Sequence, residues 1–161
     1  MESLGDPQPA QTKSSQLVWP VLLALGVALI YAQTLRHAFV NLDDPGYVYQ
    51  NVMVRRGLNG AGVLWAMTSL AMSNWHPLTW MSYMLDWRLH GESAGGFHLT
   101  NVLLHGINTL LLFWILRAMT GAAGRSAFAA ALLALHPLRV ESVAWIAERK
   151  DVLSGLFWLL S

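Results

Sequence analysis

The sequence contains no cysteine and has few charged residues. Without cysteine, disulfide bonds and thiolate chemistry are excluded. Only 12% of the 161 residues are charged, whereas a soluble domain usually carries about 25%. The formal net charge of +1 provides no basic face of the kind that binds nucleic acid. These absences argue against a soluble domain and against a nucleic-acid partner.

Apolar and aromatic residues are abundant instead. Hydrophobic residues make up 55% of the chain, and there are eight tryptophans. Tryptophan is enriched where a membrane helix meets the aqueous phase. We therefore expect an all-α, multi-pass integral membrane protein whose partner is the lipid bilayer.

The first apolar run covers residues 17–35 and is long enough to span a bilayer. Pro20 near its beginning suits the first turn of a helix. A cleaved signal peptide is the alternative, but only Lys13 precedes the run and no small-residue cleavage site follows it. Residues 1–16 are polar and aperiodic, which predicts a disordered cytoplasmic tail.

Three further apolar runs predict spans at about 98–119, 126–138 and 152–161. His136-Pro137 interrupts the third run. The fourth run has about half the length of a span, so we expect the chain to be the N-terminal fragment of a longer membrane domain.

The segment between the first two spans is too polar to cross a bilayer. Residues 58–72 and 77–89 have mixed apolar and polar positions, which predicts amphipathic juxtamembrane helices in the first outer loop. Gly91 suits the end of the second helix. Gly95-Gly96 predicts a turn after it.

Alternation of the spans places two charged loops on one side of the membrane. If the tail is cytoplasmic, the loop after the first span and residues 139–151 both lie outside. The opposite loop carries Arg117 and Arg125 without an acid, which agrees with the positive-inside rule. The two outer loops can therefore contribute to one site.

Adjacent carboxylates follow the first span at Asp43 and Asp44, directly before Pro45. Such a pair can supply a general base beside a group that orients a reactant or binds a metal ion. The alternative is a structural turn, because aspartate before Pro-Gly is good turn chemistry.

Several histidine and asparagine side chains are also candidates. His76 precedes the second amphipathic helix, where it can accept a proton or simply begin the helix. His98, Asn101, His105 and Asn108 are spaced three, four and three residues apart, so they share one helix face. His98 and Asn101, near the outer end, are predicted to border a site. The deeper pair can instead form hydrogen bonds between helices.

Two adjacent cations, Arg149 and Lys150, end the second charged loop. They can bind a phosphate, arginine through its bidentate fork. A solvated charged loop is the alternative.

In this order, the motifs resemble those of the GT-C membrane glycosyltransferases. The residues of these motifs are most similar to those of the protein O-mannosyltransferase-like proteins that carry tetratricopeptide repeats after their membrane domain. The segments that carry the resemblance are Asn-Leu-Asp-Asp at 41–44, Asn-Trp-His-Pro-Leu-Thr-Trp at 74–80, His-Leu-Thr-Asn-Val-Leu-Leu-His at 98–105, and the long motif at 136–154.

The resemblance implies an inverting transfer of sugar from a polyprenyl-phosphate-linked donor to a protein or glycan acceptor. Asp43 would be the base, with Asp44 as the other candidate, and the second carboxylate would orient the acceptor or a divalent metal ion. Arg149, and next Lys150, would hold the departing phosphate, while His76 lines the donor pocket. A divalent metal ion is the one cofactor that the resemblance allows, and it implies no certain cofactor.

The resemblance further implies an active site on the extracytoplasmic side of the membrane, here the bacterial inner membrane. The chain alone is predicted to be inactive, because the family's membrane domain has many more spans. The alternative function is a non-catalytic membrane anchor for a tetratricopeptide-repeat scaffold protein.

Overall fold

The computed structural model describes residues 13–161, and every regular element in that range is a helix. The expected all-α class is therefore confirmed. Residues 1–12 of the predicted tail lie outside the described range. The remaining tail residues, 13–16, already belong to the first helix, α1 (Lys13–Tyr31).

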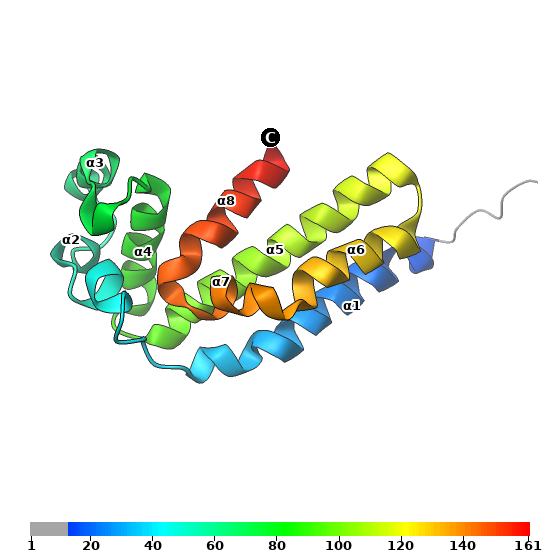
Figure 1. Cartoon of the computed structure of the whole chain (residues 1–161), viewed down its shortest axis with the longest axis horizontal. Coiled ribbons are helices and arrows are strands. Elements are labelled where there is room, and N and C mark those ends of the chain that lie inside the picture. Colours follow the sequence, from blue (N-terminus) through cyan, green and yellow to red (C-terminus); the bar gives the residue numbers. More distant parts are fainter. Residues whose placement is uncertain (1–12) are drawn as a thin grey trace, which may run out of the picture.

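Three helices lie side by side along the long axis of the molecule (Figure 1): α1, α5 (Ala94–Thr120) and α6 (Ala123–Leu135). Two segments are long and apolar enough to cross a membrane by themselves, Leu17–Arg36 and Ala94–Thr120. The first includes η1 (Ala32–Arg36), a 3-10 turn that continues α1. These helices are those expected of a membrane protein.

The third apolar segment is bent. Helix α6 ends at Leu135, and the segment Pro137–Ala144 continues at an angle of 53° to it, so the two form at most one broken span. His136 is extended, with φ −69° and ψ 131°. Proline lacks a backbone N–H and disfavours a helical conformation in the residue before it. The expected interruption thus falls at His136-Pro137.

Two sequence-based details differ from the structure. Pro20 lies inside α1, because the helix begins before the apolar run. Gly95 and Gly96 lie in the first turn of α5 and do not form a separate turn. A Cβ atom on Gly95 would clash with the carbonyl oxygen of Leu35, and one on Gly96 would clash with the ring of His90. These glycines permit close packing.

A compact unit of short helices, residues 45–90, follows the first span and is called the aromatic unit here. The last helix of the unit, α4 (Pro77–His90), ends just before Gly91 (φ 59°), as expected. The predicted helix 58–72 is shorter in the structure. It begins after the N-cap Asn59, whose side chain accepts from Gly62 N at 3.0 Å, and it ends at Thr68 because Ser69 is extended (φ −80°, ψ 137°). The elements of the unit are η2 (Pro45–Tyr49, a single π-helical turn), α2 (Val52–Arg55), α3 (Gly60–Thr68), η3 (Ala71–Ser73) and α4 (Pro77–His90).

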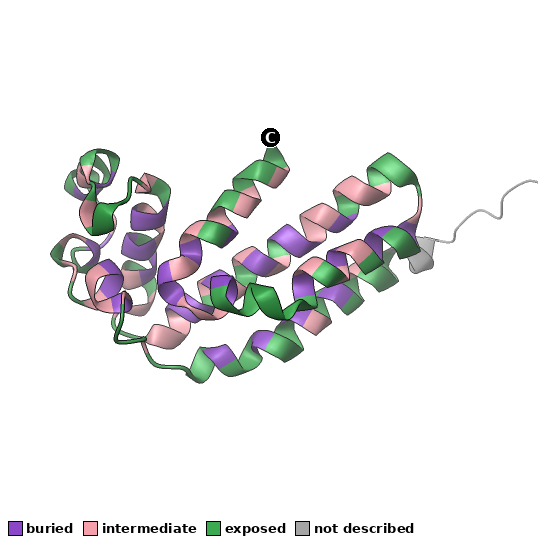
Figure 2. Ribbon diagram, viewed as in Figure 1, coloured by how far each residue is buried: buried purple, intermediate pink, exposed green. Residues whose placement is uncertain are grey.

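The core of the aromatic unit is a stack of buried rings. Tyr47 stacks on Trp80 with ring centroids 5.1 Å apart, and Tyr83 and Phe97 complete the cluster. Phe97 belongs to α5, so the same core fixes the unit to the first turn of that helix. Figure 2 shows the resulting band of buried residues on α4 and the outward, exposed face of α1.

The chain returns to the aromatic unit after α6. The short elements η4 (Pro137–Arg139), α7 (Val140–Ala144) and η5 (Ile146–Glu148) lead into α8 (Arg149–Leu160). Helix α8 runs between α4 and α5 (Figure 1) and contacts both. The hydroxyl of buried Tyr83 donates to the Ile146 carbonyl at 2.7 Å. This segment is therefore packed against the loop that follows the first span.

Candidate functional site

The Asp44 carboxylate joins the two charged loops. Its side chain is fully buried, its Oδ2 accepts from Val40 N at 2.7 Å and its Oδ1 accepts from Ala147 N at 3.1 Å. These two donors lie more than one hundred residues apart in sequence, 147 − 40 = 107. The acidic loop and the segment that carries Lys150 are thus in direct contact, which agrees with the topology predicted from the alternation of spans.

Burial raises the pKa of Asp44, because the charged form loses solvation, and the hydrogen bonds from Val40 and Ala147 oppose this increase. The neighbouring charge of Asp43 raises the pKa of Asp44 further. Asp43 itself is half-buried, and within residues 13–161 no hydrogen bond reaches its carboxylate. Its backbone carbonyl accepts from Tyr47 N at 3.0 Å. The pair thus consists of one fixed and one accessible carboxylate.

Arg149, the first candidate for binding phosphate, lies in the interior of the protein. It is 0% exposed, and its Nη2 forms a salt bridge of 2.6 Å with Oδ2 of Asp86 in α4. Its Nε donates to Asn101 Oδ1 at 2.7 Å and its Nη2 to the Phe97 carbonyl at 2.8 Å. The guanidinium also lies 4.6 Å above the ring of Tyr83.

This network leaves no face of Arg149 open to a ligand. A buried guanidinium needs a counter-charge and hydrogen-bond acceptors, and α4 and α5 supply both. Thr100 reinforces the partner by donating to Asp86 Oδ1 at 2.8 Å. We therefore revise the predicted role: Arg149 joins α4, α5 and α8, and does not itself face a phosphate.

Two further predicted site residues also lie inside the protein. Asn101 is fully buried and donates to the carbonyls of Val143 and Trp145, each at 3.2 Å. Its amide is therefore satisfied by the chain itself. His98 is 1% exposed and packs edge-on against His37, with ring centroids 5.9 Å apart. Neither residue lines the pocket described next.

Lys150 and His76 do meet at one pocket, called the Lys150 pocket here. Its volume is about 340 Å³. The Lys150 ammonium forms an ion pair of 2.7 Å with Glu148, which does not itself line the pocket. The other walls are largely apolar. The residues that line it are Trp75, His76, Pro77, Leu78, Thr79, Lys150, Leu153, Ser154 and Phe157.

His76 is held in place by aromatic packing. Its ring stacks on Tyr47 at 5.5 Å, and Trp80 lies 5.0 Å away. Burial lowers the pKa of His76, and the nearby Lys150 ammonium lowers it further. Its Nε2 is buried and has no hydrogen-bond partner among the described residues. A neutral imidazole in this position can accept a hydrogen bond from a ligand.

The two aspartates do not amount to a metal site by themselves. Among residues 13–161, no group of three or more histidine, cysteine, aspartate or glutamate side chains is placed to hold an ion. Both oxygens of Asp44 already accept backbone N–H groups, whereas divalent cations take several oxygen ligands. The described residues therefore do not fit the divalent ion that the resemblance allows.

Sequence reasoning missed Asp86 and Glu148, which are the acidic partners of Arg149 and Lys150. A signal for Asp86 was present, because it lies three residues after Tyr83 on the helix face that is otherwise buried and aromatic. A charge on such a face requires a partner of opposite sign. The sequence does not show that this partner is Arg149.

No protein-family model and no solved structure matches the chain. It has relatives among known proteins that are described as protein O-mannosyl-transferases. A protein O-mannosyl-transferase TMTC1 of Mus musculus is 34% identical over 152 residues, which covers 87% of this chain and 16% of that protein. The Homo sapiens TMTC1 is 30% identical over 172 residues, or 98% of the chain and 19% of the relative.

The chain is a homologue of the protein O-mannosyl-transferases. A tmtc2 protein of Xenopus laevis with the same description is 39% identical over 88 residues, 55% of the chain and 10% of the relative. The relationship predicted from the motifs is thereby confirmed. The chain spans less than one fifth of the length of these O-mannosyl-transferases. The bacterial inner membrane and the orientation of the chain in the membrane stay predictions.

Proposed function

We propose that the chain forms part of the active site of an inverting glycosyltransferase that uses a polyprenyl-phosphate-linked sugar, mannose in the first instance. The acceptor is a hydroxyl group of a protein or glycan, and the site faces the extracytoplasmic side of the membrane. The main support is the bridge made by Asp44 between Val40 and Ala147. It brings an accessible carboxylate and the cation-bearing segment 146–150 into one unit.

Asp43 is the base in this proposal. The acceptor oxygen forms a new bond to the anomeric carbon of the sugar, its proton moves to the Asp43 carboxylate, and the bond between the anomeric carbon and the phosphate oxygen breaks. A single displacement of this kind inverts the anomeric centre. Asp44 acts as the positioning residue, because its hydrogen bonds fix the loop that carries Asp43.

The Lys150 pocket is the proposed place for the donor phosphate. Of the two predicted cations, only Lys150 lines a pocket, since Arg149 is enclosed by its partners. An ammonium has three N–H donors, and the ion pair with Glu148 uses one of them. The unpartnered Nε2 of His76 is a second polar group in the same wall. Apolar side chains, among them Leu153 and Phe157, suit the lipid part of the donor.

The proposal is tested with Asp43→Asn in the full-length protein, in an assay of transfer from polyprenyl-phosphate mannose to an acceptor peptide. Removing a general base is expected to lower the turnover by about 10²–10⁴-fold, while the protein level in the membrane stays unchanged. Glu141→Gln is the matched control, because Glu141 is an exposed acid in the other charged loop, residues 139–151. Unchanged turnover in Asp43→Asn excludes Asp43 as the base and favours the anchor function.

A further inference from the structure

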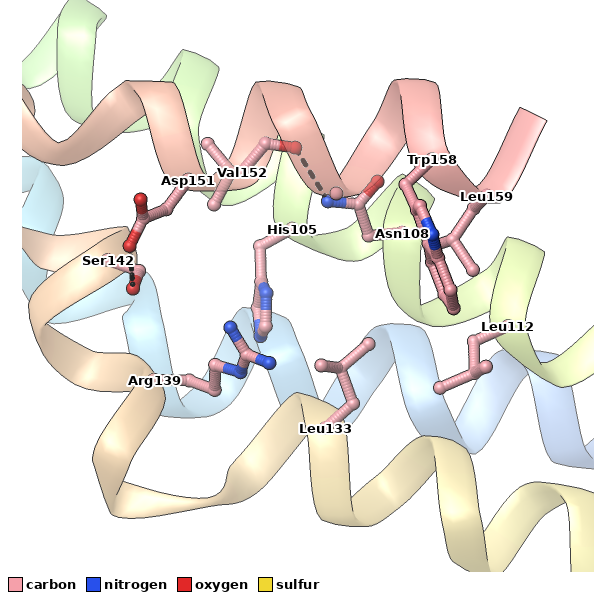
Figure 3. Close-up of a pocket in the computed structure, with 11 residues that line it drawn as sticks. His105, Asn108, Leu112, Leu133, Arg139, Ser142, Asp151, Val152, Trp158 and Leu159 are labelled. Carbon is pink, nitrogen blue, oxygen red and sulfur yellow. Dashed lines mark hydrogen bonds between the residues drawn. The ribbon is translucent and has the colours of Figure 1, made fainter. Parts of the chain in front are cut away.

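Helix α8 has a second cavity on its other flank. Lys150, Leu153 and Phe157 face the Lys150 pocket, whereas Asp151, Val152 and Trp158 face a cavity of about 150 Å³ between α5, α6 and α8. Figure 3 shows this cavity, called the α8 cavity here. The proposed transfer does not use it.

One end of the α8 cavity is polar (Figure 3). It is lined by the guanidinium of Arg139 and the carboxylate of Asp151, and the latter accepts from the hydroxyl of Ser142 at 3.0 Å. His105 projects from α5 toward Arg139 in the same view. His105 Nε2 lies 3.1 Å from the Ala134 carbonyl, which can only accept. Nε2 therefore carries a proton, and the neutral ring presents Nδ1 as an acceptor.

Asn108 supplies the observation that points to a ligand. Its side chain is 5% exposed, and its Nδ2 donates to the Val152 carbonyl at 2.8 Å. The amide oxygen Oδ1 is buried and has no hydrogen-bond partner in the part of the chain that the structure describes. A buried acceptor without a partner is costly. A hydroxyl group in the α8 cavity would satisfy it.

The opposite end of the cavity is apolar. Leu112, Leu133 and Leu159 line it together with the indole of Trp158 (Figure 3). The volume is close to that of a protein cavity that accommodates benzene, about 150 Å³. The α8 cavity therefore has room for one six-membered ring, and an apolar substituent would leave it past Trp158, which is 77% exposed.

The charged residues that line the cavity favour a ligand with hydroxyl groups over one with a phosphate. Arg139 and Asp151 contribute one charge of each sign, and both line the cavity. This differs from the Lys150 pocket, where the acidic partner Glu148 is not among the lining residues. A phosphate would meet the Asp151 carboxylate, whereas hydroxyl groups can donate to Asp151 and Asn108 and accept from Arg139.

We propose that the α8 cavity binds the pyranose ring of a glycoside with an apolar aglycone. Hydroxyl groups of the ring bond to Asn108, Asp151 and Arg139, and the aglycone leaves the cavity past Trp158. This site is separate from the Lys150 pocket and does not depend on Asp43 acting as a base. The proposal therefore stands even if the proposed transfer reaction is wrong.

The test measures binding of octyl α-D-mannopyranoside to the whole chain in phosphatidylcholine nanodiscs by saturation-transfer NMR. We expect saturable binding that is about tenfold or more stronger than that of 1-octanol, which lacks most of the hydroxyl groups. Octyl phosphate is the third probe and is expected to bind no better than 1-octanol. Equal binding of the mannoside and 1-octanol, or preferential binding of octyl phosphate, would overturn the proposal.

Two variants locate the binding. Asp151→Asn is expected to weaken mannoside binding by about tenfold through the loss of a charged acceptor. Gly155→Ala adds a Cβ atom 3.2 Å from Asn108 Nδ2 and narrows the cavity with little change in polarity. Glu141→Gln, outside the cavity, is the control and should bind as the parent chain does. Undiminished binding in both cavity variants would contradict the assignment.

Discussion

The aromatic unit and the bundle of α1, α5 and α6 are stabilised in different ways. In the aromatic unit, large rings such as Tyr47, Trp80 and Tyr83 are fully or nearly fully buried. The helix bundle has small residues among its buried contacts, with Ala127 and Ala130 of α6 packed in one cluster with Leu23 and Phe113. The first arrangement resembles the core of a soluble domain, and the second is the close packing common between membrane helices.

The difference has a consequence for the candidate site, which lies where the two regions meet. Rings alone do not fix the angle between the aromatic unit and α8. The buried pair of Arg149 and Asp86 does so, because it joins α4 to α8 and is also bonded to Asn101 in α5. The position of Lys150, the next residue along α8, depends on this pair.

The largest expected effect is therefore the loss of Arg149. In Arg149→Ala, the Asp86 carboxylate remains buried without its counter-charge, and the free energy of unfolding should fall by about 3–5 kcal/mol. Thermal or denaturant unfolding in detergent measures this change. The double variant Arg149→Met/Asp86→Leu is the control, because it leaves neither charge unpaired and should be less destabilised than the single variant. A single variant as stable as the parent would remove Arg149 from the network.

Sequence reasoning predicted the contact between the two charged loops but not the separate roles of the two cations. The contact follows from the alternation of spans, which places the loop with Asp44 and the loop with Ala147 on one side. Arg149 and Lys150 are both cationic and only about 100° apart around a helix. Which of them faces inward depends on Asp86, an acid 63 residues earlier (149 − 86) on another helix.

Local packing explains the other differences. A pair of glycines usually predicts a turn, but Gly95 and Gly96 lie in the first turn of α5. These positions are glycine because Leu35 and His90 lie too close for a side chain. The resemblance favours Asp43 over Asp44 as the base, but the sequence does not show which of two adjacent aspartates is buried. The backbone N–H groups that bury Asp44 come from Val40 and from the distant Ala147. Long-range contacts of this kind leave no periodic pattern in the amino-acid sequence.

The second largest effect is expected in the pH dependence of stability, to which the buried Asp44 should contribute. Its pKa is raised in the folded protein, so the folded state retains a proton that the unfolded state releases at about pH 4. The stability contributed by this proton is present below the ordinary pKa of aspartate and is lost as the pH rises through the raised value. Melting temperatures across this acidic range should show the decrease in the parent chain. The decrease should be absent from Asp44→Asn, and a persistent decrease would assign it to another group.

The smallest effect is expected within the bundle, where Asn108 can be compared with Asn101. Both asparagines are buried on the same face of α5. Asn101 accepts from the charged Arg149 and donates to two carbonyls, so Asn101→Leu should cost about 1.5–3 kcal/mol or more. Asn108 forms one hydrogen bond across helices, to Val152. Such bonds contribute about 0.6 kcal/mol on average in a membrane protein. Asn108→Leu also removes the unpartnered Oδ1, so its net loss of unfolding free energy should be smaller still. Unfolding of the two variants in the same detergent measures the difference. A cost as large as that of Asn101→Leu would show that the bundle, like the junction of α4, α5 and α8 around Arg149, is fixed by its polar contacts.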